Sequence, residues 1–314
     1  MKAFALTAPD QPAHIVDIPE PEVEAQGLRI SIRAASVNGF DAYQATGQLM
    51  GMMEHSLPTI IGRDFAGIVE AVGSGRVDVS IGDAVLGFIP STPPLHDGTY
   101  TERITTANVV VARKPGGLSF EAAAAIPLAG ATALDAVDAV GVGPGDVVFI
   151  AGATGGVGSF AIQLAAQRGA TVIATARPGE EEAFVRDLGA SDTIDYSAGE
   201  VAGALRAKYP DGVTALIDLV NRDDAFPPMA ALVRDGGAIA TTLGAADVEA
   251  LAQRSVRATN VMGSPTSEKL ATLADAAAGG SLRVEVQRTF PLDNAADALQ
   301  AFSSGSLGKL VLVP

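Results

Sequence analysis

The stretch IAGATGGVG, at residues 150–158, decides the fold of this chain. It follows a continuous apolar run at residues 146–150, which predicts a strand buried on both faces. Residues 159–168 come next and predict a helix. Because glycine has no Cβ, the turn between the two elements can be tight and can approach a ligand closely. The helix N-terminus then faces that ligand with unpaired N–H groups, so the stretch predicts a site for an anionic group.

The sequence around this stretch repeats the alternation of strand and helix. The predicted strands lie at residues 171–175, 215–219 and 238–242, and the predicted helices at residues 120–125, 180–188 and 226–233. Such alternation is typical of an α/β domain with a parallel, doubly wound sheet.

The first third of the chain has a different pattern. Residues 28–34 alternate apolar and polar side chains, and short apolar runs follow, punctuated by Gly, Pro and Asp. This predicts a barrel-like, mostly antiparallel β module. Residues 268–313 predict two helices and two strands, which either extend the parallel sheet or return to the first module.

Composition and charge limit the classes of protein that this chain can be. It has 314 residues, 48% of them hydrophobic, which suggests about two domains with cores of their own. Its formal net charge of −15 disfavours nucleic acid and anionic membranes as partners. It has no cysteine, and its three histidines match no metal-binding motif. The apolar run within residues 1–9 is too short for a signal peptide, so we expect a soluble, cytoplasmic protein that acts on a small molecule.

Residues 153–158 match the spacing of the dinucleotide-binding fingerprint, with alanine in its first position. An ordinary glycine-rich turn between a strand and a helix is the alternative interpretation. A P-loop is excluded because Ser159, and not a lysine, follows the last glycine.

The segment after the second predicted strand bears on the choice of nucleotide. Residues 171–175 end without the acid that holds the ribose 2′-hydroxyl of NAD(H), and Arg177 follows in reach of a 2′-phosphate. This favours NADP(H), although Arg177 is alternatively a solvated loop residue. Residues 180–182 are three consecutive acids. They weaken binding of a 2′-phosphate unless they point away, and they alternatively begin the next helix.

Four segments of the chain carry a resemblance to a known family. They are residues 36–43 with V-N-x-x-D-x-Y, residues 61–85 with G-x-D-x-x-G-x-V and G-D-x-V, residues 129–133 with G-x-T-A, and residues 151–158 with A-x-A-x-G-G-V-G. On these segments the chain resembles the zinc-independent quinone oxidoreductase branch of the medium-chain dehydrogenase/reductase superfamily, the zeta-crystallin-like proteins, over nearly its whole length.

The resemblance implies a two-domain architecture. A GroES-like, β-rich catalytic domain would comprise residues 1–114 and 266–314, and a Rossmann NADP(H)-binding domain with a doubly wound parallel sheet would comprise residues 115–265. The active site would lie in the cleft between them. The family also implies a homodimer paired through an edge strand near residues 257–262, since an unpaired apolar edge invites aggregation.

The resemblance also gives a meaning to the missing metal motif. Zinc-dependent relatives have Cys where Asn38 stands, His where Arg63 stands, and a third ligand near Leu128. Asn, Arg and Leu cannot bind zinc in that way. Without a Lewis acid to stabilise an alkoxide, reduction of an electrophilic acceptor is favoured over oxidation of an alcohol.

Candidate roles follow from the resemblance for individual residues. Asn38, Asp41 and Tyr43 are the candidate catalytic residues. The candidate cofactor-binding residues are Thr132, Thr154, Gly155, Gly156, Val157, Gly158, Arg177, Tyr196, Leu243, Gly244 and Lys309. Three alternatives stay open: Asp41 caps a helix that starts near Ala42, Tyr43 is a core aromatic residue, and Lys309 is a solvated turn residue.

These residues predict an NADPH-dependent, zinc-independent oxidoreductase that transfers a hydride to a quinone or another activated carbonyl or alkene. Asn38 would stabilise charge on the acceptor oxygen, and the proton would come from Tyr43 or water. One alternative is an enoyl-thioester or 2-alkenal reductase, whose carrier phosphates would need basic residues such as Arg63 and Arg103. An alternative of another class is a non-catalytic, crystallin-like protein that binds NADPH.

Overall fold

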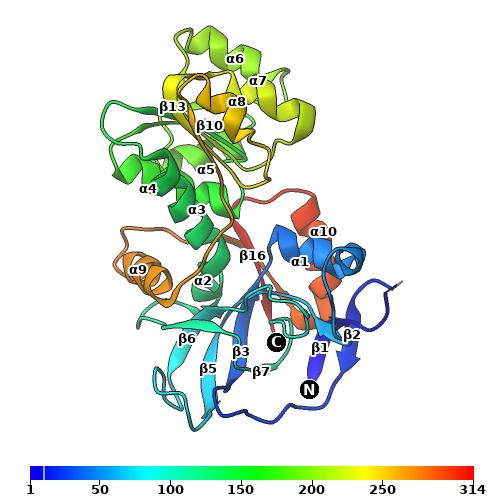
Figure 1. Cartoon of the computed structure of the whole chain (residues 1–314). Helices are drawn as coiled ribbons and strands as arrows, with labels where there is room; N and C mark the ends of the chain where they lie inside the picture. The colour runs from blue at the N-terminus through cyan, green and yellow to red at the C-terminus, as the bar shows by residue number, and fades with distance from the viewer. Residues whose placement is uncertain (10) are drawn as a thin grey trace. The chain divides into compact units, whose positions relative to one another are not determined.

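The computed structural model describes residues 1–9 and 11–314, and they form two compact units (Figure 1). Unit 1 comprises Met1–Leu128 and Pro265–Pro314, and unit 2 comprises Ala129–Ser264. Unit 1 extends past the boundary expected at residue 115, because helix α2 (Phe120–Ala124) packs against strands of its main sheet.

Unit 1 is built mostly of antiparallel strands. Its strands are β1 (Lys2–Leu6), β2 (His14–Asp17), β3 (Leu28–Ser36), β4 (Thr59–Ile60), β5 (Asp64–Val72), β6 (Ala84–Phe88), β7 (Arg103–Thr106), β8 (Val110–Arg113), β15 (Val286–Pro291) and β16 (Lys309–Val313). One sheet has the order β2-β1-β4, and the other has the order β15-β16-β3-β5-β6-β8 with β7 also paired to β3. The predicted antiparallel β module is confirmed.

The C-terminal segment returns to unit 1. Figure 1 shows β16, in red, beside β3, in blue, and the two strands pair antiparallel with Leu312 opposite Ala35. Periodicity left open whether this segment extends the parallel sheet or returns to the first module, and the second alternative is correct. The helices of this unit, besides α2, are α1 (Gly39–Ala45), η1 (Gln48–Gly51), α9 (Ser267–Ala278), η3 (Leu292–Asn294) and α10 (Ala295–Ser303).

Unit 2 contains the predicted doubly wound parallel sheet, which is confirmed (Figure 1). Its strands are β9 (Val147–Ala151), β10 (Thr171–Thr175), β11 (Asp192–Ile194), β12 (Val213–Asp218), β13 (Val233–Thr241) and β14 (Arg257–Asn260). They lie in the order β11-β10-β9-β12-β13-β14, and all neighbours are parallel. The chain therefore leaves β9 first toward β10 and later toward β12, which is the doubly wound order.

The helices of unit 2 differ from the predicted ones in their number and in their ends. They are α3 (Pro127–Val140), which begins in unit 1, α4 (Gly156–Gln167), α5 (Glu180–Asp187), α6 (Val201–Lys208), η2 (Asp223–Ala225), α7 (Phe226–Ala230) and α8 (Val248–Ala252). The helix predicted at residues 226–233 ends at Ala230, and Val233 already belongs to β13. Among the described residues, no helix is long and apolar enough to cross a membrane.

Burial in the parallel sheet follows strand position. The central strand β9 is buried almost throughout, and Phe149 lies in the same apolar cluster as Ile173, Leu216 and Ile239 from neighbouring strands. Within the part of the chain that the structure describes, strand β14 pairs with β13 alone and is largely exposed. The homodimer expected through this edge stays a prediction.

Candidate active site

The carboxyl ends of the parallel strands gather the candidate residues of unit 2. Gly155 follows β9, Arg177 follows β10, Tyr196 follows β11 and Leu243 follows β13. Because the strands are parallel, these loops lie along one edge of the sheet. The strand order reverses between β9 and β12, and ligands of doubly wound folds bind at such a switch point.

The glycine loop has a tight geometry that requires glycine at two positions. Gly152 has φ +80°, in the left-handed region. A Cβ on Gly158 would lie 2.4 Å from the carbonyl oxygen of Gly152 and 2.5 Å from that of Ala153, which is far too close. Gly155 is the N-cap of α4, and Gly156, Val157 and Gly158 form the first turn of that helix. Their backbone N–H groups are therefore among those that a helix leaves without internal partners.

A side chain from the neighbouring strand fixes the start of this loop. The Thr175 hydroxyl accepts hydrogen bonds from the backbone N–H groups of Gly152 (3.0 Å) and Ala153 (3.4 Å). Thr175 is buried at the end of β10. The loop is thus held in place before any ligand binds.

A pocket of about 460 Å³ adjoins the glycine loop. It is lined by Ala151, Gly152, Thr154, Thr175, Tyr196, Val201, Val220, Asn221 and Met229. The pocket thus combines glycine-loop backbone, aromatic and apolar walls and a few polar groups, as nucleotide-binding sites usually do. Of the candidate cofactor-binding residues, Thr154 and Tyr196 line it and the others do not. Residues 155–158 begin α4, Thr132 lies buried in α3, and Leu243 and Gly244 follow β13.

Asn221 owes its position on the pocket wall to a carboxylate that sequence reasoning missed. Asp218, the last residue of β12, accepts hydrogen bonds from the backbone N–H groups of Val220 and Asn221 and from the Asn221 amide. Burial raises the pKa of Asp218, and these donors offset part of the rise.

Arg177 lies in a cluster with a glutamate and a tyrosine. Its Nε donates to Glu181 Oε1 (2.8 Å), its backbone N–H donates to Glu181 Oε2 (2.8 Å), and its guanidinium lies over the Tyr196 ring. The Tyr196 hydroxyl also donates to Glu181 Oε1 (3.0 Å). Burial pushes the pKa of Glu181 up, but the bonds from Arg177 and Tyr196 together hold it below its ordinary value.

This cluster corrects the interpretation of the segment after β10. The strand itself ends without an acid, but Glu181 brings a carboxylate from α5 back to Arg177. The three consecutive acids at residues 180–182 do begin a helix, and one of them, Glu181, points toward Arg177. Arg177 is exposed, yet it is an ion-paired residue and not simply a solvated one.

Unit 1 holds a second cluster, centred on Asn38. Asn38 Oδ1 accepts a hydrogen bond from Lys309 Nζ (2.6 Å), and Asn38 Nδ2 donates to Asp64 Oδ2 (2.9 Å). A lysine cannot accept and a carboxylate cannot donate, so these neighbours determine which way the amide points. Burial lowers the pKa of Lys309 and raises that of Asp64, and the charge of each offsets part of the other's shift. Among the described residues, the second N–H of the Asn38 amide has no acceptor and is left for a ligand.

Asp41 and Tyr43 lie on α1 in different environments. Asp41 is fully buried and accepts hydrogen bonds from the Asn38 backbone N–H (2.9 Å) and the Tyr100 hydroxyl (3.2 Å). The N-cap of α1 is Asn38, and Asp41 lies at the third position of the helix, where its side chain accepts from the N-cap backbone. The alternative is thus right that Asp41 helps to cap this helix, but the helix begins at Gly39 and not near Ala42. Burial, reinforced by the charge of Asp64, raises the pKa of Asp41 to about 7. Tyr43 is 42% exposed, so the alternative of a core aromatic is wrong.

Three cations of unit 1 that bear on the site are engaged by the protein itself. Lys309 is buried and also donates to the carbonyl of Val37 (2.7 Å), so the alternative of a solvated turn residue is wrong. Arg63 is buried and donates to Gln44 and to the carbonyl of Asp97. Arg103 pairs with Glu70. The basic residues that a carrier phosphate would need are thus already paired.

A zinc ion does not fit the Asn38 cluster. The Lys309 ammonium occupies the one oxygen that Asn38 could offer to a metal, and a second cation there would be repelled. Among residues 1–9 and 11–314, no group of three His, Cys, Asp or Glu side chains could hold a metal ion.

Comparison with known proteins agrees with this architecture. The alcohol dehydrogenase GroES-like domain family matches residues 24–171, and the zinc-binding dehydrogenase family matches residues 188–312. The chain is 32% identical over 305 residues to a quinone oxidoreductase of Pseudomonas aeruginosa, and the match covers 91% of each protein. The chain belongs to the quinone oxidoreductase branch of the medium-chain dehydrogenase/reductases. It is therefore an oxidoreductase with a GroES-like unit and a Rossmann unit that binds a nicotinamide cofactor.

Three further proteins are similar to this chain in sequence or in structure. The chain is 30% identical over 302 residues to a 2-methylene-furan-3-one reductase of Solanum lycopersicum, covering 94% of this chain and 73% of that protein. A quinone oxidoreductase structure from Coxiella burnetii has a TM-score of 0.89 at 33% identity and covers 100% of this chain and 99% of its own. A mycobacterial protein solved in complex with NADPH has a TM-score of 0.85 at 29% identity, with 100% of both chains covered.

Proposed function

We propose that this oxidoreductase uses NADPH to reduce a quinone, or another activated carbonyl or alkene, without a zinc ion. The observation that carries the proposal is the pocket at the carboxyl edge of the parallel sheet. The glycine loop bounds it on one side, and Tyr196, stacked beside Arg177, bounds it on another.

The residues present fit a dinucleotide. Glycine at position 158 lets α4 begin close to the loop, so the N–H groups of its first turn are available for a pyrophosphate. Arg177 supplies a positive charge for a 2′-phosphate. The family relationship and the solved NADPH complex of a relative support a nicotinamide cofactor, and Arg177 supports the phosphorylated form. When bound, the nicotinamide supplies a hydride.

Asn38 is the residue we assign to the acceptor. Uptake of a hydride by a quinone leaves negative charge on its oxygen, and an oriented N–H donor stabilises that charge. Two electrons and two protons in all convert the quinone to a hydroquinone: one proton travels with the electron pair as hydride, and one comes from Tyr43 or water. The fixed amide of Asn38, with one N–H left over, suits this role.

The test is acceptor-dependent oxidation of NADPH by chelator-treated protein. The acceptors are 1,4-benzoquinone, a simple enone and an enoyl thioester, and each assay is repeated with NADH. The proposal predicts activity that survives chelation, prefers NADPH and is highest with the quinone. A preference for the enone or the thioester would move the assignment to alkene reduction, as the name of the Solanum relative suggests.

Two further outcomes would reject the proposal. Cofactor binding without turnover of any acceptor would favour a protein that only binds NADPH. Activity lost on chelation and restored by zinc would show that the chain finds metal ligands elsewhere.

A further inference from the structure

We propose that Glu181 limits the preference of this site for NADPH over NADH, by neutralising the arginine that recognises the 2′-phosphate. The inference rests on the proposed cofactor site and adds a residue that sets its selectivity. It concerns the cluster of Arg177, Glu181 and Tyr196 beside the pocket.

Both carboxylate oxygens of Glu181 accept hydrogen bonds from the protein itself. Oε2 accepts the Arg177 backbone N–H, and Oε1 accepts Arg177 Nε and the Tyr196 hydroxyl. An acid near this point in the chain would ordinarily bind the ribose 2′-hydroxyl of NAD(H). Here three donors of the protein bind the carboxylate, and the Glu181 side chain is largely buried. Glu181 is therefore a positioning residue that holds Arg177, and not a ligand of the ribose.

The position of Arg177 leaves part of it available to a ligand. Its side chain is 60% exposed, whereas that of Glu181 is 10% exposed. Among the described residues, Nη1 of Arg177 makes no hydrogen bond, while Nε and Nη2 face Glu181. A 2′-phosphate can thus pair with the free edge of the guanidinium. The pair as a whole is neutral, so the phosphate gains less than it would from a lone arginine.

The charge of Glu181 opposes the phosphate directly. A unit charge about 8 Å from a phosphate that carries about two charges, with the dielectric constant of water, changes affinity about fivefold. NADH lacks the 2′-phosphate and is affected little. Removal of the charge should therefore change the ratio of the two affinities, and not both together.

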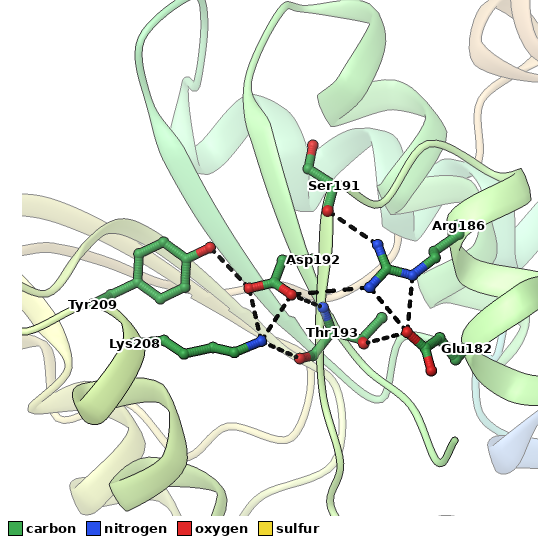
Figure 2. A network of polar contacts seen from close by, with 7 residues as sticks. All are labelled: Glu182, Arg186, Ser191, Asp192, Thr193, Lys208 and Tyr209. Carbon is green, nitrogen blue, oxygen red and sulfur yellow. Dashed lines mark hydrogen bonds and ion pairs between the residues drawn. The ribbon is translucent and has the colours of Figure 1, made fainter. Parts of the chain in front are cut away.

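The next residue of α5 offers a matched control. Glu182 also pairs with an arginine four residues on, because Arg186 Nε donates to Glu182 Oε1 (2.9 Å). Figure 2 shows that this pair belongs to a separate network with Thr193 and Asp192. Glu182 is not bonded to Arg177 through its side chain. A change at Glu182 removes the same charge from the same helix without altering the Arg177 pair.

The experiment measures dissociation constants of NADPH and NADH for the wild-type chain and for Glu181→Gln, Glu182→Gln and Arg177→Ala. Glutamine removes the charge but keeps one acceptor oxygen, which can serve either the Arg177 backbone N–H, now on Oε2, or the Tyr196 hydroxyl, now on Oε1. We expect Glu181→Gln to raise the NADPH preference about fivefold, Glu182→Gln to raise it less than twofold, and Arg177→Ala to abolish it. Because the readout is a ratio, a partly unfolded preparation does not change it.

Two results would overturn the inference. A Glu181→Gln preference equal to or below that of wild type would mean that Glu181 does not oppose the phosphate. Equal effects of the two glutamine variants would mean that general charge, and not the pair, sets the preference. Failure of every variant and of wild type to bind either nucleotide would instead reject the proposed cofactor site itself.

Discussion

The contact between α4 and the glycine loop gives the sharpest prediction. In Gly158→Ala the new Cβ would lie 2.4 Å from the carbonyl oxygen of Gly152 and 2.5 Å from that of Ala153. Both neighbours are backbone atoms, so no side chain can rotate away. The start of α4 has to move outward from the loop by about the overlap, on the order of 1 Å.

The magnitude follows from two opposing terms. Overpacking of a tight contact costs about 3 kcal/mol, whereas alanine in place of glycine within a helix returns about 1 kcal/mol. We therefore expect Gly158→Ala to lower the free energy of unfolding by about 2 kcal/mol. The displaced helix N-terminus should also weaken NADPH binding at least tenfold, because its N–H groups no longer converge on the same point.

Gly155→Ala is the matched control in the same loop. Its Cβ would meet nothing closer than 3.7 Å, the carbonyl oxygen of Gly152, and its φ of −73° suits alanine. Urea unfolding should therefore show little change for Gly155→Ala, while NADPH titration should still show a loss if the pyrophosphate lies over this N-cap. Equal stability of the two variants would refute the reasoning.

Three further predictions concern both units. The raised pKa of Asp41 means that the folded chain binds a proton that the unfolded chain releases between about pH 4 and about pH 7, so stability is lost as pH rises through that window. In Asp41→Asn this pH-dependent loss of stability should vanish, so the difference in unfolding free energy from wild type, measured by urea titration at each pH, should change across the window. A difference that is the same at every pH would contradict the raised pKa. Lys309→Met leaves Asp64 buried without its nearby positive charge and should cost about 3 kcal/mol of unfolding free energy, measured in the same way; a loss below about 1 kcal/mol would show the charge to be unneeded. Thr175→Val removes the acceptor of the Gly152 N–H and should weaken NADPH binding about fivefold in a fluorescence titration. Thr175→Ser keeps the hydroxyl and should bind NADPH as wild type does. Equal losses of affinity in the valine and serine variants would show that the hydroxyl does not hold the loop.

The parts of the site that are local in the chain could be predicted from the sequence. The glycine loop, its strand and its helix are neighbours in sequence, so periodicity and glycine spacing suffice to find them. The spacing of Arg177 and Glu181, four residues apart, was equally visible. The sequence shows the acids at residues 180–182, but which of them turns back to Arg177 depends on how α5 begins.

The parts that depend on distant pairing could not be predicted. Lys309 meets Asn38 because β16 pairs with β3, and no local pattern encodes that partnership. A lysine after a glycine is typical of a solvated turn, and burial became evident only with the fold. The exposure of Tyr43 follows from the start of α1: once the helix begins at Gly39, Tyr43 lies two residues after the buried Asp41 and on the opposite face.

The central claim is that the chain moves a hydride from bound NADPH to an acceptor. The most direct measurement uses NADPH deuterated at C4 on one face or the other, with 1,4-benzoquinone and chelator-treated protein. The account predicts that label on one face is lost from the nicotinamide and slows the reaction, while label on the other face is retained. Retention of both labels, with NADPH bound but not oxidised, would contradict the account.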